Sequence, residues 1–316
     1  MKDMELRKVY ADTLIELAEQ DKKIVLLEAD LMKASGTGTF KEKFPGRTFD
    51  VGVAEANMVG VASGLSASGK IPFANTFGCF AGRRTYDQFF ISANYAKQNV
   101  KLVGTDPGVS AEFNGGTHMP FEDAGIMRNI PGLVVVEACD PVSLKKLTKE
   151  IAYHNGCVYM RVDRKKKGFV IYDENEAFEL GKGKVVIDGS DITLIANGSV
   201  MVEEAIGAQN MLSEEGISAA VIDMHTIKPL DDELVLKYAE KTGAIVTCEN
   251  HQIYNGLGSA VAEVLSENHP TLLKRVGVND EFGEVGTLDY LKKRFGMTKE
   301  NIYNKAKELL VKKNNR

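Results

Sequence analysis

Short apolar runs alternate with longer amphipathic stretches along the sequence, and this alternation limits the fold more than any other feature. The chain opens with an amphipathic stretch at 3–20, in which Leu6, Val9 and Leu17 recur at helical spacing. The run KIVLLEAD at 23–30 follows, and it is too short for a helix but suits a buried strand. Strands that alternate with helices predict a mostly parallel sheet covered by helices on both faces.

The alternation continues to about residue 165, stops, and then starts again. Strand-like runs follow at 71–75, 100–104, 133–138 and 157–162, with helix-like stretches near 56–67, 84–98, 122–128 and 141–154. Asp140 and Pro141 predict a helix N-cap followed by proline at the first helical position. Residues 166–190 are charged, rich in glycine and without a helical period, which indicates a linker. We therefore predict an α/β fold of two doubly wound domains in series, at 1–165 and 191–316, each a mostly parallel sheet flanked by helices.

Composition narrows the class of protein. The 316 residues are 44% apolar and 26% charged, and the net charge of −5 gives no long-range attraction to nucleic acid or anionic membranes. The four cysteines show neither CxxC pairing nor metal-ligand spacing. The N-terminus lacks the apolar region of a signal peptide, and no apolar run approaches the length of a bilayer span. We expect a soluble cytoplasmic protein with no metal ligands of its own.

Glu55 is the most informative residue, because it lies among apolar neighbours in FDVGVAEANMVGVASGLSASGKIPFANTFGCF at 49–80. Burying a carboxylate is costly unless it is paired or protonated. Two interpretations follow from the residues alone. Glu55 is either a loop glutamate whose side chain reaches water, or a buried carboxyl held to hydrogen-bond a ring nitrogen of a ligand.

The segment at 49–80 resembles the cofactor-binding half-site of transketolases, with a glutamate after V-G-x-x, a helix of small residues and then T-F-x-x-F. The resemblance implies that Glu55 bonds N1′ of the aminopyrimidine ring of thiamine diphosphate, so that the ring's amino nitrogen can take the proton from thiazolium C2. It also implies that Phe77 and Phe80 form an aromatic wall against the pyrimidine, although two phenylalanines three apart are also ordinary core. Asp30, in EADL, matches a family aspartate at a strand end near the cofactor.

The loop VGTDPGVSAEFNGGTHMPFEDAGIMRNIPGL at 103–133 resembles the substrate loop of the same family. Its G-G-T-H motif places His118 where transketolases have a histidine that contacts the sugar hydroxyls. Two positions depart from the family, because Asn114 replaces an aspartate and Asp106 replaces a histidine that helps to hold the sugar phosphate. An aspartate repels a phosphate, so Asp106 puts the specificity for phosphorylated sugars in doubt.

Two arginines match family residues that bind the substrate phosphate: Arg7, in ELRKVYAD, and Arg164, in MRVDRKKK. Paired arginines suit bidentate phosphate capture, but either residue could equally lie on the surface. The stretch Gly256-Leu257-Gly258 could cradle a phosphate at a helix start, although tight helix packing is the simpler role. His251 is expected to be structural.

The resemblance covers essentially the whole chain and includes the ending EFGEVGTLDYLKKRFGMTKENIYNKAKELL at 281–310. Transketolases also have a G-D-G…N segment that holds the diphosphate and its divalent ion, and this sequence has no such segment. The nearest match, at 187–190, lacks the asparagine. We therefore expect the C-terminal subunit of a split transketolase, which transfers a two-carbon ketol unit between a ketose and an aldose, with sugar phosphates of pentose phosphate metabolism as substrates. The resemblance implies thiamine diphosphate and Mg²⁺, a partner N-terminal subunit that carries the diphosphate and metal site, self-association and a heterotetramer.

Two other functions stay open on the residues. A β subunit of a thiamine-dependent 2-oxoacid dehydrogenase shares the domain order and the glutamate, while the G-G-T-H motif and the ending at 281–310 favour a transketolase. A catalytically silent α/β scaffold subunit is the second alternative, but it would have no need for the Glu55 carboxyl in apolar surroundings.

Overall fold

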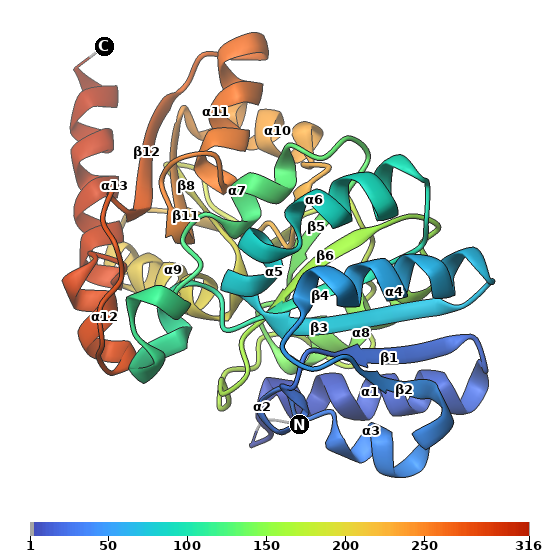
Figure 1. The fold of residues 1–316 in the computed structure, drawn as a ribbon. Coiled ribbons are helices and arrows are strands. Elements are labelled where there is room, and N and C mark those ends of the chain that lie inside the picture. Colours follow the sequence, from blue (N-terminus) through green and yellow to red (C-terminus); the bar gives the residue numbers. More distant parts are fainter. Residues whose placement is uncertain (1–2, 316) are drawn as a thin grey trace.

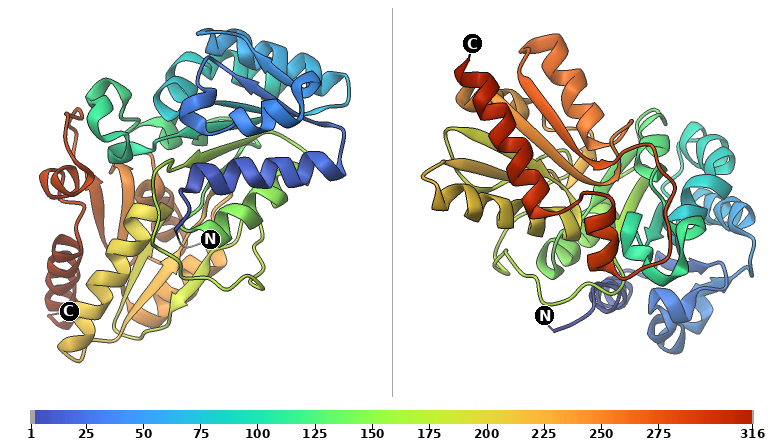
Figure 2. Two further views of the ribbon diagram at one scale, coloured as in Figure 1. Left: turned by 90° about the horizontal axis from the view of Figure 1, so that it is seen from below. Right: turned by 90° about the vertical axis from the view of Figure 1, so that its left-hand side faces the viewer.

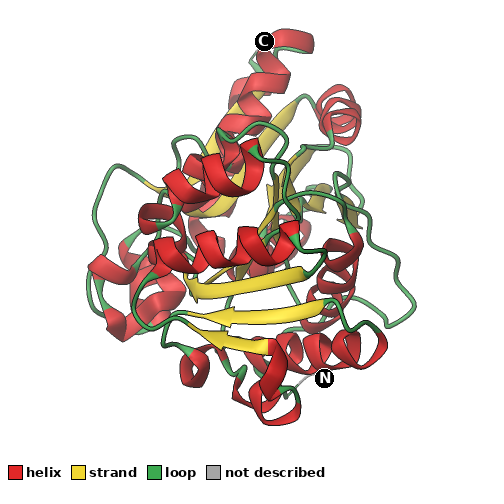
Figure 3. Cartoon of the chain, turned by 45° about the vertical axis from the view of Figure 1, so that its right-hand side comes forward, coloured by secondary structure: helices red, strands yellow, loops and turns green. Residues whose placement is uncertain are grey.

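The computed structural model describes residues 3–315 and contains two helix-flanked sheets, one for each alternating block of the sequence. In Figure 1 the first block, blue to green, lies mainly on the right, and the second, yellow to red, lies mainly on the left. Figure 3 shows helices on both sides of the strands. Within the described residues every strand pair is parallel except two, so the predicted fold of mostly parallel sheets in series is confirmed.

Seven strands form the first sheet, in the order β10-β5-β6-β4-β3-β1-β2. They are β1 (Ile24–Glu28), β2 (Thr48–Asp50), β3 (Ile71–Phe77), β4 (Lys101–Thr105), β5 (Val134–Glu137), β6 (Val158–Val162) and β10 (Thr226–Lys228). Successive side chains point to opposite faces, so Leu26 packs in one core while its neighbours Val25 and Leu27 pack in another. The strands β1, β3, β4, β5 and β6 match the runs predicted from the sequence.

Helices cover both faces of this sheet. α1 (Leu6–Gln20) and α8 (Pro141–Tyr153) pack together on one face, as Figure 2 shows. The Asp140 carboxylate caps α8 as predicted, accepting from the N–H of Ser143 at 2.7 Å. The remaining helical elements of this half are α2 (Met32–Ser35), α3 (Gly38–Lys43), α4 (Glu55–Ala67), α5 (Gly78–Arg84), α6 (Tyr86–Gln88), α7 (Asp123–Arg128) and 3₁₀ turns at Pro45–Arg47, Gly108–Asn114 and Gly116–His118.

The helix predicted at 84–98 is not regular. It begins as α6 and continues as a π-helix over Phe89–Tyr95. Within that segment the Asn94 amide donates to the carbonyl of Phe89 at 2.8 Å, so a side chain supplies a partner for this backbone group.

The second sheet has five strands, in the order β12-β11-β8-β9-β7. They are β7 (Lys184–Ile187), β8 (Ile192–Ala196), β9 (Ala219–Asp223), β11 (Ala244–Gln252) and β12 (Leu272–Val278). The helices of this half are α9 (Gly198–Glu214), α10 (Asp232–Thr242), α11 (Leu257–Asn268), α12 (Leu288–Arg294) and α13 (Lys299–Asn314). None of the helices in residues 3–315 is long and apolar enough to cross a bilayer.

Two strands cross the boundaries expected from the sequence. β7 lies inside the predicted linker 166–190 and pairs antiparallel with β9. β10 belongs to the second half of the chain, yet it pairs antiparallel with β5 and forms an edge of the first sheet. The sheets thus do not follow these boundaries strictly, and the division into 1–165, 166–190 and 191–316 stays a prediction.

A buried ionic network joins the two halves. Arg161, on β6, is fully buried and donates to Asp123 at 2.9 Å, to Glu137 and to the carbonyl of Asn250 at 3.0 Å. Glu137 also accepts from the Asn197 amide of the second half at 2.7 Å. Burial raises the pKa of Glu137 to about 7, and the Arg161 charge opposes that shift. The Arg161 guanidinium thus joins the first sheet directly to β11. Through Glu137 it also joins the sheet to Asn197, at the start of α9.

Arg161→Met should destabilise the chain by about 3–5 kcal/mol, because it leaves Asp123 and Glu137 buried without their cation. Urea denaturation followed by circular dichroism measures the change. Lys8→Met is the matched control, because Lys8 forms an exposed i,i+4 pair with Asp12 at 3.1 Å and its removal should cost less than about 1 kcal/mol. Equal effects of the two substitutions would contradict the role given to the network.

Candidate active site

The carboxyl ends of β3, β4 and β6 meet at one edge of the first sheet. Phe77 pairs with Thr105, and Thr105 pairs with Val162, so the residues that follow these strands lie near one another. This edge is where open α/β sheets bind ligands. The residues predicted to act in catalysis and substrate binding are found in the loops and helix starts along it.

Glu55 is the first residue of α4 and is 4% exposed. Its carboxylate accepts from Nη1 of Arg84, the last residue of α5, at 2.8 Å. The interpretation of Glu55 as a loop glutamate that reaches water is therefore wrong. The start of a helix favours an acidic side chain, because the unpaired N–H groups there carry partial positive charge.

Two phenylalanines form a wall beside this carboxylate. Phe77 precedes α5 and Phe80 lies in its first turn, and their ring centroids are 5.9 Å apart. The guanidinium carbon of Arg84 lies 3.9 Å from the Phe80 ring centroid, which connects the wall to Glu55. The His118 ring lies 5.3 Å from that of Phe80 and 6.1 Å from that of Phe77. The structure thus brings four predicted residues into one cluster and adds Arg84, which the sequence did not single out.

Arg83 holds the loop that carries His118. It donates to the carbonyl of Thr117 at 3.0 Å and to that of Met119 at 3.3 Å, and it pairs with Glu122. The Thr117 hydroxyl lies 2.9 Å from Nδ1 of His118. These contacts set both the path of the loop and the orientation of the imidazole.

Asp106 and Arg164 form a buried pair rather than two independent groups. Nε of Arg164 lies 2.7 Å from each carboxylate oxygen of Asp106, and both residues are buried. Burial raises the pKa of Asp106, while the Arg164 charge lowers it. The guanidinium carbon of Arg164 also lies 4.7 Å from the Phe77 ring centroid. The alternative of Arg164 as a surface residue is therefore wrong, and the pair lies against the aromatic wall.

Arg7 reaches the same place from α1. It donates to the carbonyl of Ala34 at 3.1 Å, and Arg164 donates to the same carbonyl at 3.3 Å. The Arg7 side chain is 29% exposed and pairs with Glu5. The two predicted arginines therefore lie close together, but each already has a carboxylate partner.

Asp30 and Asn114 lie in exposed loops at strand and turn ends. Asp30 follows β1 with a φ of +60°, and its backbone N–H donates to the Asp50 carboxylate at 3.0 Å. Asn114 ends the 3₁₀ turn Gly108–Asn114. Within residues 3–315 neither side chain makes a hydrogen bond, so both are available to solvent or a ligand.

Gly256-Leu257-Gly258 does not form an open phosphate cradle. The N–H groups of its last two residues donate to the Glu249 carboxylate at 2.8 and 2.9 Å. His251 accepts from the N–H of Gly125 at 3.2 Å. The helix start and the histidine therefore both have internal partners, which agrees with the structural roles expected from the sequence.

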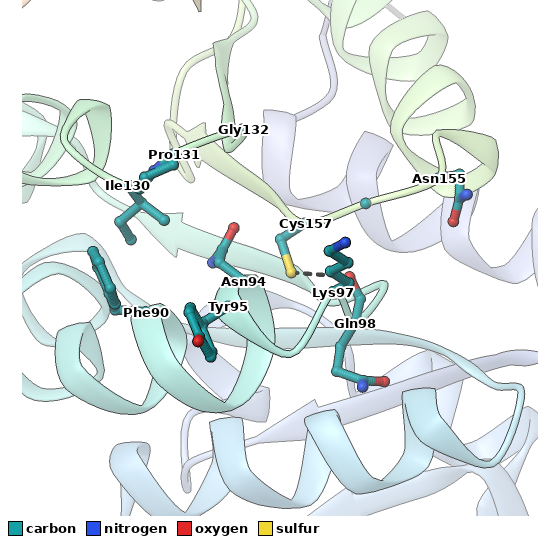
Figure 4. A pocket seen from close by; sticks show the side chains of 11 residues that line it. Phe90, Asn94, Tyr95, Lys97, Gln98, Ile130, Pro131, Gly132, Asn155 and Cys157 are labelled. Carbon is teal, nitrogen blue, oxygen red and sulfur yellow. Dashed lines mark hydrogen bonds between the residues drawn. The ribbon is translucent and has the colours of Figure 1, made fainter.

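A hollow of about 870 Å³ lies at the opposite, amino edge of the first sheet (Figure 4). Its lining includes Gln98, Gly132 and Cys157, which precede β4, β5 and β6. The Cys157 thiol donates to the carbonyl of Gln98 at 3.2 Å, the dashed contact in Figure 4. The hollow is separate from the cluster around Glu55. Within residues 3–315 no group of three or more His, Cys, Asp or Glu side chains is arranged to hold a metal ion.

Two family models match the chain in series. The transketolase pyrimidine-binding domain matches residues 2–168, and the transketolase C-terminal domain matches residues 181–302. The chain is 52% identical to a 6-deoxy-6-sulfo-D-fructose transketolase subunit of Clostridium sp. (strain MSTE9), over 98% of this chain and 95% of that one. It is 42% identical to a putative transketolase C-terminal section of Methanocaldococcus jannaschii, over 97% of this chain and 96% of that one.

A solved structure has the same architecture. It is a split-gene transketolase in the form of an inactive β4 tetramer, 40% identical to this chain, with a TM-score of 0.91 over 98% of this chain and 99% of that one. These matches favour a transketolase over the 2-oxoacid dehydrogenase subunit and over the silent scaffold. The chain belongs to the transketolase family, and over nearly its whole length it matches the separate C-terminal subunits of split transketolases.

Proposed function

We propose that this chain and an N-terminal partner subunit together form a thiamine diphosphate-dependent transketolase. The complete enzyme would transfer a two-carbon ketol unit from a ketose to an aldose. The observation that carries the proposal is the buried Glu55 carboxylate beside the rings of Phe77, Phe80 and His118. A buried carboxylate next to an aromatic wall suits a flat ring that contains nitrogen.

The chemistry of these groups fits the pyrimidine end of the cofactor. Glu55 would share a proton with ring nitrogen N1′, while Phe77 and Phe80 would pack against the ring. Asp30, exposed after β1, would lie near the cofactor. The cofactor, when bound, would supply the thiazolium carbon needed for ketol transfer. We assign its diphosphate and the Mg²⁺ ion to the partner subunit, as the family resemblance implies.

His118 would orient the sugar. Its Nδ1 is engaged by the Thr117 hydroxyl at 2.9 Å, which leaves Nε2 to contact the sugar hydroxyls. Asn114, exposed on the same loop, would add an amide that can donate and accept. Arg83 acts through this loop, because it holds the carbonyls on both sides of His118.

The anionic end of the sugar would be met by Arg7 and Arg164. Asp106 lowers the positive charge at that place, because its buried carboxylate is paired with Arg164. Reduced positive charge suits a monoanionic group such as a sulfonate better than a phosphate dianion. The relative that is 52% identical carries a sulfonated sugar in its name. We therefore infer a ketose with a sulfonate end as donor, in place of the sugar phosphates expected from the family.

Assembly would use the outer face of α4. Gly60 and Gly64 are exposed, and no heavy atom outside their own helix lies within 4 Å of an added Cβ. Bare helix backbone lets another subunit pack closely beside Glu55. The structural relative forms a β4 tetramer. We infer that this chain self-associates through α4 and that the N-terminal partner completes a heterotetramer.

We also infer a cytoplasmic location, because the four cysteines of this chain are free and buried, which suits a reducing compartment.

The isolated chain should bind thiamine diphosphate weakly and turn over no sugar, because it holds only the pyrimidine half of the proposed site. Isothermal calorimetry with the cofactor and Mg²⁺ measures this on the chain alone and on the chain mixed with its partner. Tight, Mg²⁺-dependent binding to the chain alone would contradict the division of the site between two subunits.

Glu55→Gln should lower the turnover of the reconstituted complex by about 10²- to 10⁴-fold, the usual effect of removing a positioned acid–base group. Cofactor affinity should fall less, because Phe77 and Phe80 still pack against the ring. Hydrogen–deuterium exchange at cofactor C2 is the direct measurement, and His118→Ala is the control that should impair sugar turnover but leave this exchange intact. Normal exchange in Glu55→Gln would show that the role is wrongly assigned.

Asp106→Asn should shift the preference of the complex from sulfonated toward phosphorylated ketoses by roughly tenfold in the ratio of kcat/KM values. The substitution removes one negative charge beside Arg164, and a tenfold change in the ratio corresponds to about 1.4 kcal/mol. Steady-state kinetics with fructose 6-phosphate and 6-deoxy-6-sulfofructose measure the ratio. Arg164→Met is the control and should weaken the use of both sugars, whereas an unchanged ratio in Asp106→Asn would rule out a selective role.

A further inference from the structure

Arg84 contacts the two groups that the proposed cofactor needs. Its Nη1 donates to the Glu55 carboxylate at 2.8 Å, and its guanidinium carbon lies 3.9 Å from the centroid of the Phe80 ring. A guanidinium is flat, carries N–H donors and stacks on aromatic faces. An aminopyrimidine is also flat, and in the proposed function it bonds the same carboxylate and packs against the same wall. The two groups therefore compete for one position.

The surroundings of Arg84 allow it to move. Its side chain is 48% exposed, and within residues 3–315 Glu55 is its only ion-pair partner. Arg84 is the last residue of α5, so rotation about its side-chain bonds moves the guanidinium without disturbing a helix interior. The neighbouring Arg83 differs, because Glu122 and two loop carbonyls hold it in place.

The exchange of Arg84 for a pyrimidine costs little, because Glu55 keeps a partner throughout. A buried carboxylate without a partner would be costly. Arg84 is the partner of Glu55 in this structure, and a ring nitrogen of the cofactor would be its partner after the exchange. The released guanidinium recovers its contacts with water, since it is already half exposed.

We propose that Arg84 is a placeholder, meaning a side chain that occupies the pyrimidine position between Glu55 and Phe80 and must leave when thiamine diphosphate binds. The proposal rests on the proposed function. The step breaks and forms no covalent bond: one N–H···O contact and one ring contact of Arg84 are replaced by those of the pyrimidine.

The test is the affinity of the reconstituted complex for thiamine diphosphate, measured by isothermal calorimetry. Arg84→Met removes both contacts but keeps an unbranched side chain. The cofactor should therefore bind roughly tenfold more tightly, about the combined size of one ion pair with a half-exposed arginine and one cation–π contact. Arg84→Lys keeps the charge but loses the flat group, so its affinity for the cofactor should lie between that of the wild type and that of Arg84→Met. Arg83→Met is the matched control, because it removes a neighbouring cation without releasing Glu55, and it should not tighten binding.

Each other outcome overturns the placeholder. Unchanged binding in Arg84→Met would show that the guanidinium does not compete, and weaker binding would show that it helps to hold the cofactor. Failure of Arg84→Met alone to fold or assemble, checked by circular dichroism and gel filtration, would mean that Arg84 is structural. Failure of the wild-type complex and all variants to bind the cofactor would remove the proposed function itself, and the placeholder with it, so the two failures are distinguishable.

Discussion

The buried charge of Arg161 is the interaction on which the rest of the structure depends. A guanidinium removed from water must be paired, and here its partners come from the start of α7, from the end of β5 and from β11. Asp123 follows directly on the loop that carries His118, and Glu137 reaches across to Asn197 in the second half. The charge therefore restricts these elements to one arrangement, and the position of His118 over the aromatic wall follows from it.

Burial alone does not distinguish a functional carboxylate in this chain. Asp123 and Glu249 are both buried, and their partners are respectively Arg161, which is also buried, and the N–H groups at a helix start. Those partners cannot leave without disrupting the fold. Glu55 is equally buried, but its partner Arg84 is half exposed. If the proposed exchange holds, an exchangeable partner, rather than low exposure, separates a binding group from a structural one.

Local patterns predicted most of the fold, and the resemblance to transketolases singled out Phe77, Phe80 and His118 beside Glu55. The apolar runs gave the buried strands, Asp140 and Pro141 gave the start of α8, and Glu55 was conspicuous because it lies among apolar residues. Pairings between distant segments were not predictable in this way. Arg84 reads as an ordinary surface residue until α4 and α5 are folded together, and the pairing of Asp106 with Arg164 joins residues that follow two neighbouring strands.

The strand β10 has a consequence for how the chain folds as it is made. Residues 226–228 close one edge of the first sheet, and they leave the ribosome long after the other strands of that sheet. Until then β5 presents unpaired backbone groups, and an open strand edge is a template for pairing with another chain. The first half thus depends on the second half to close one edge of its sheet. A fragment cut within 166–190 would keep Glu55, Phe77 and His118 yet expose an edge prone to aggregation.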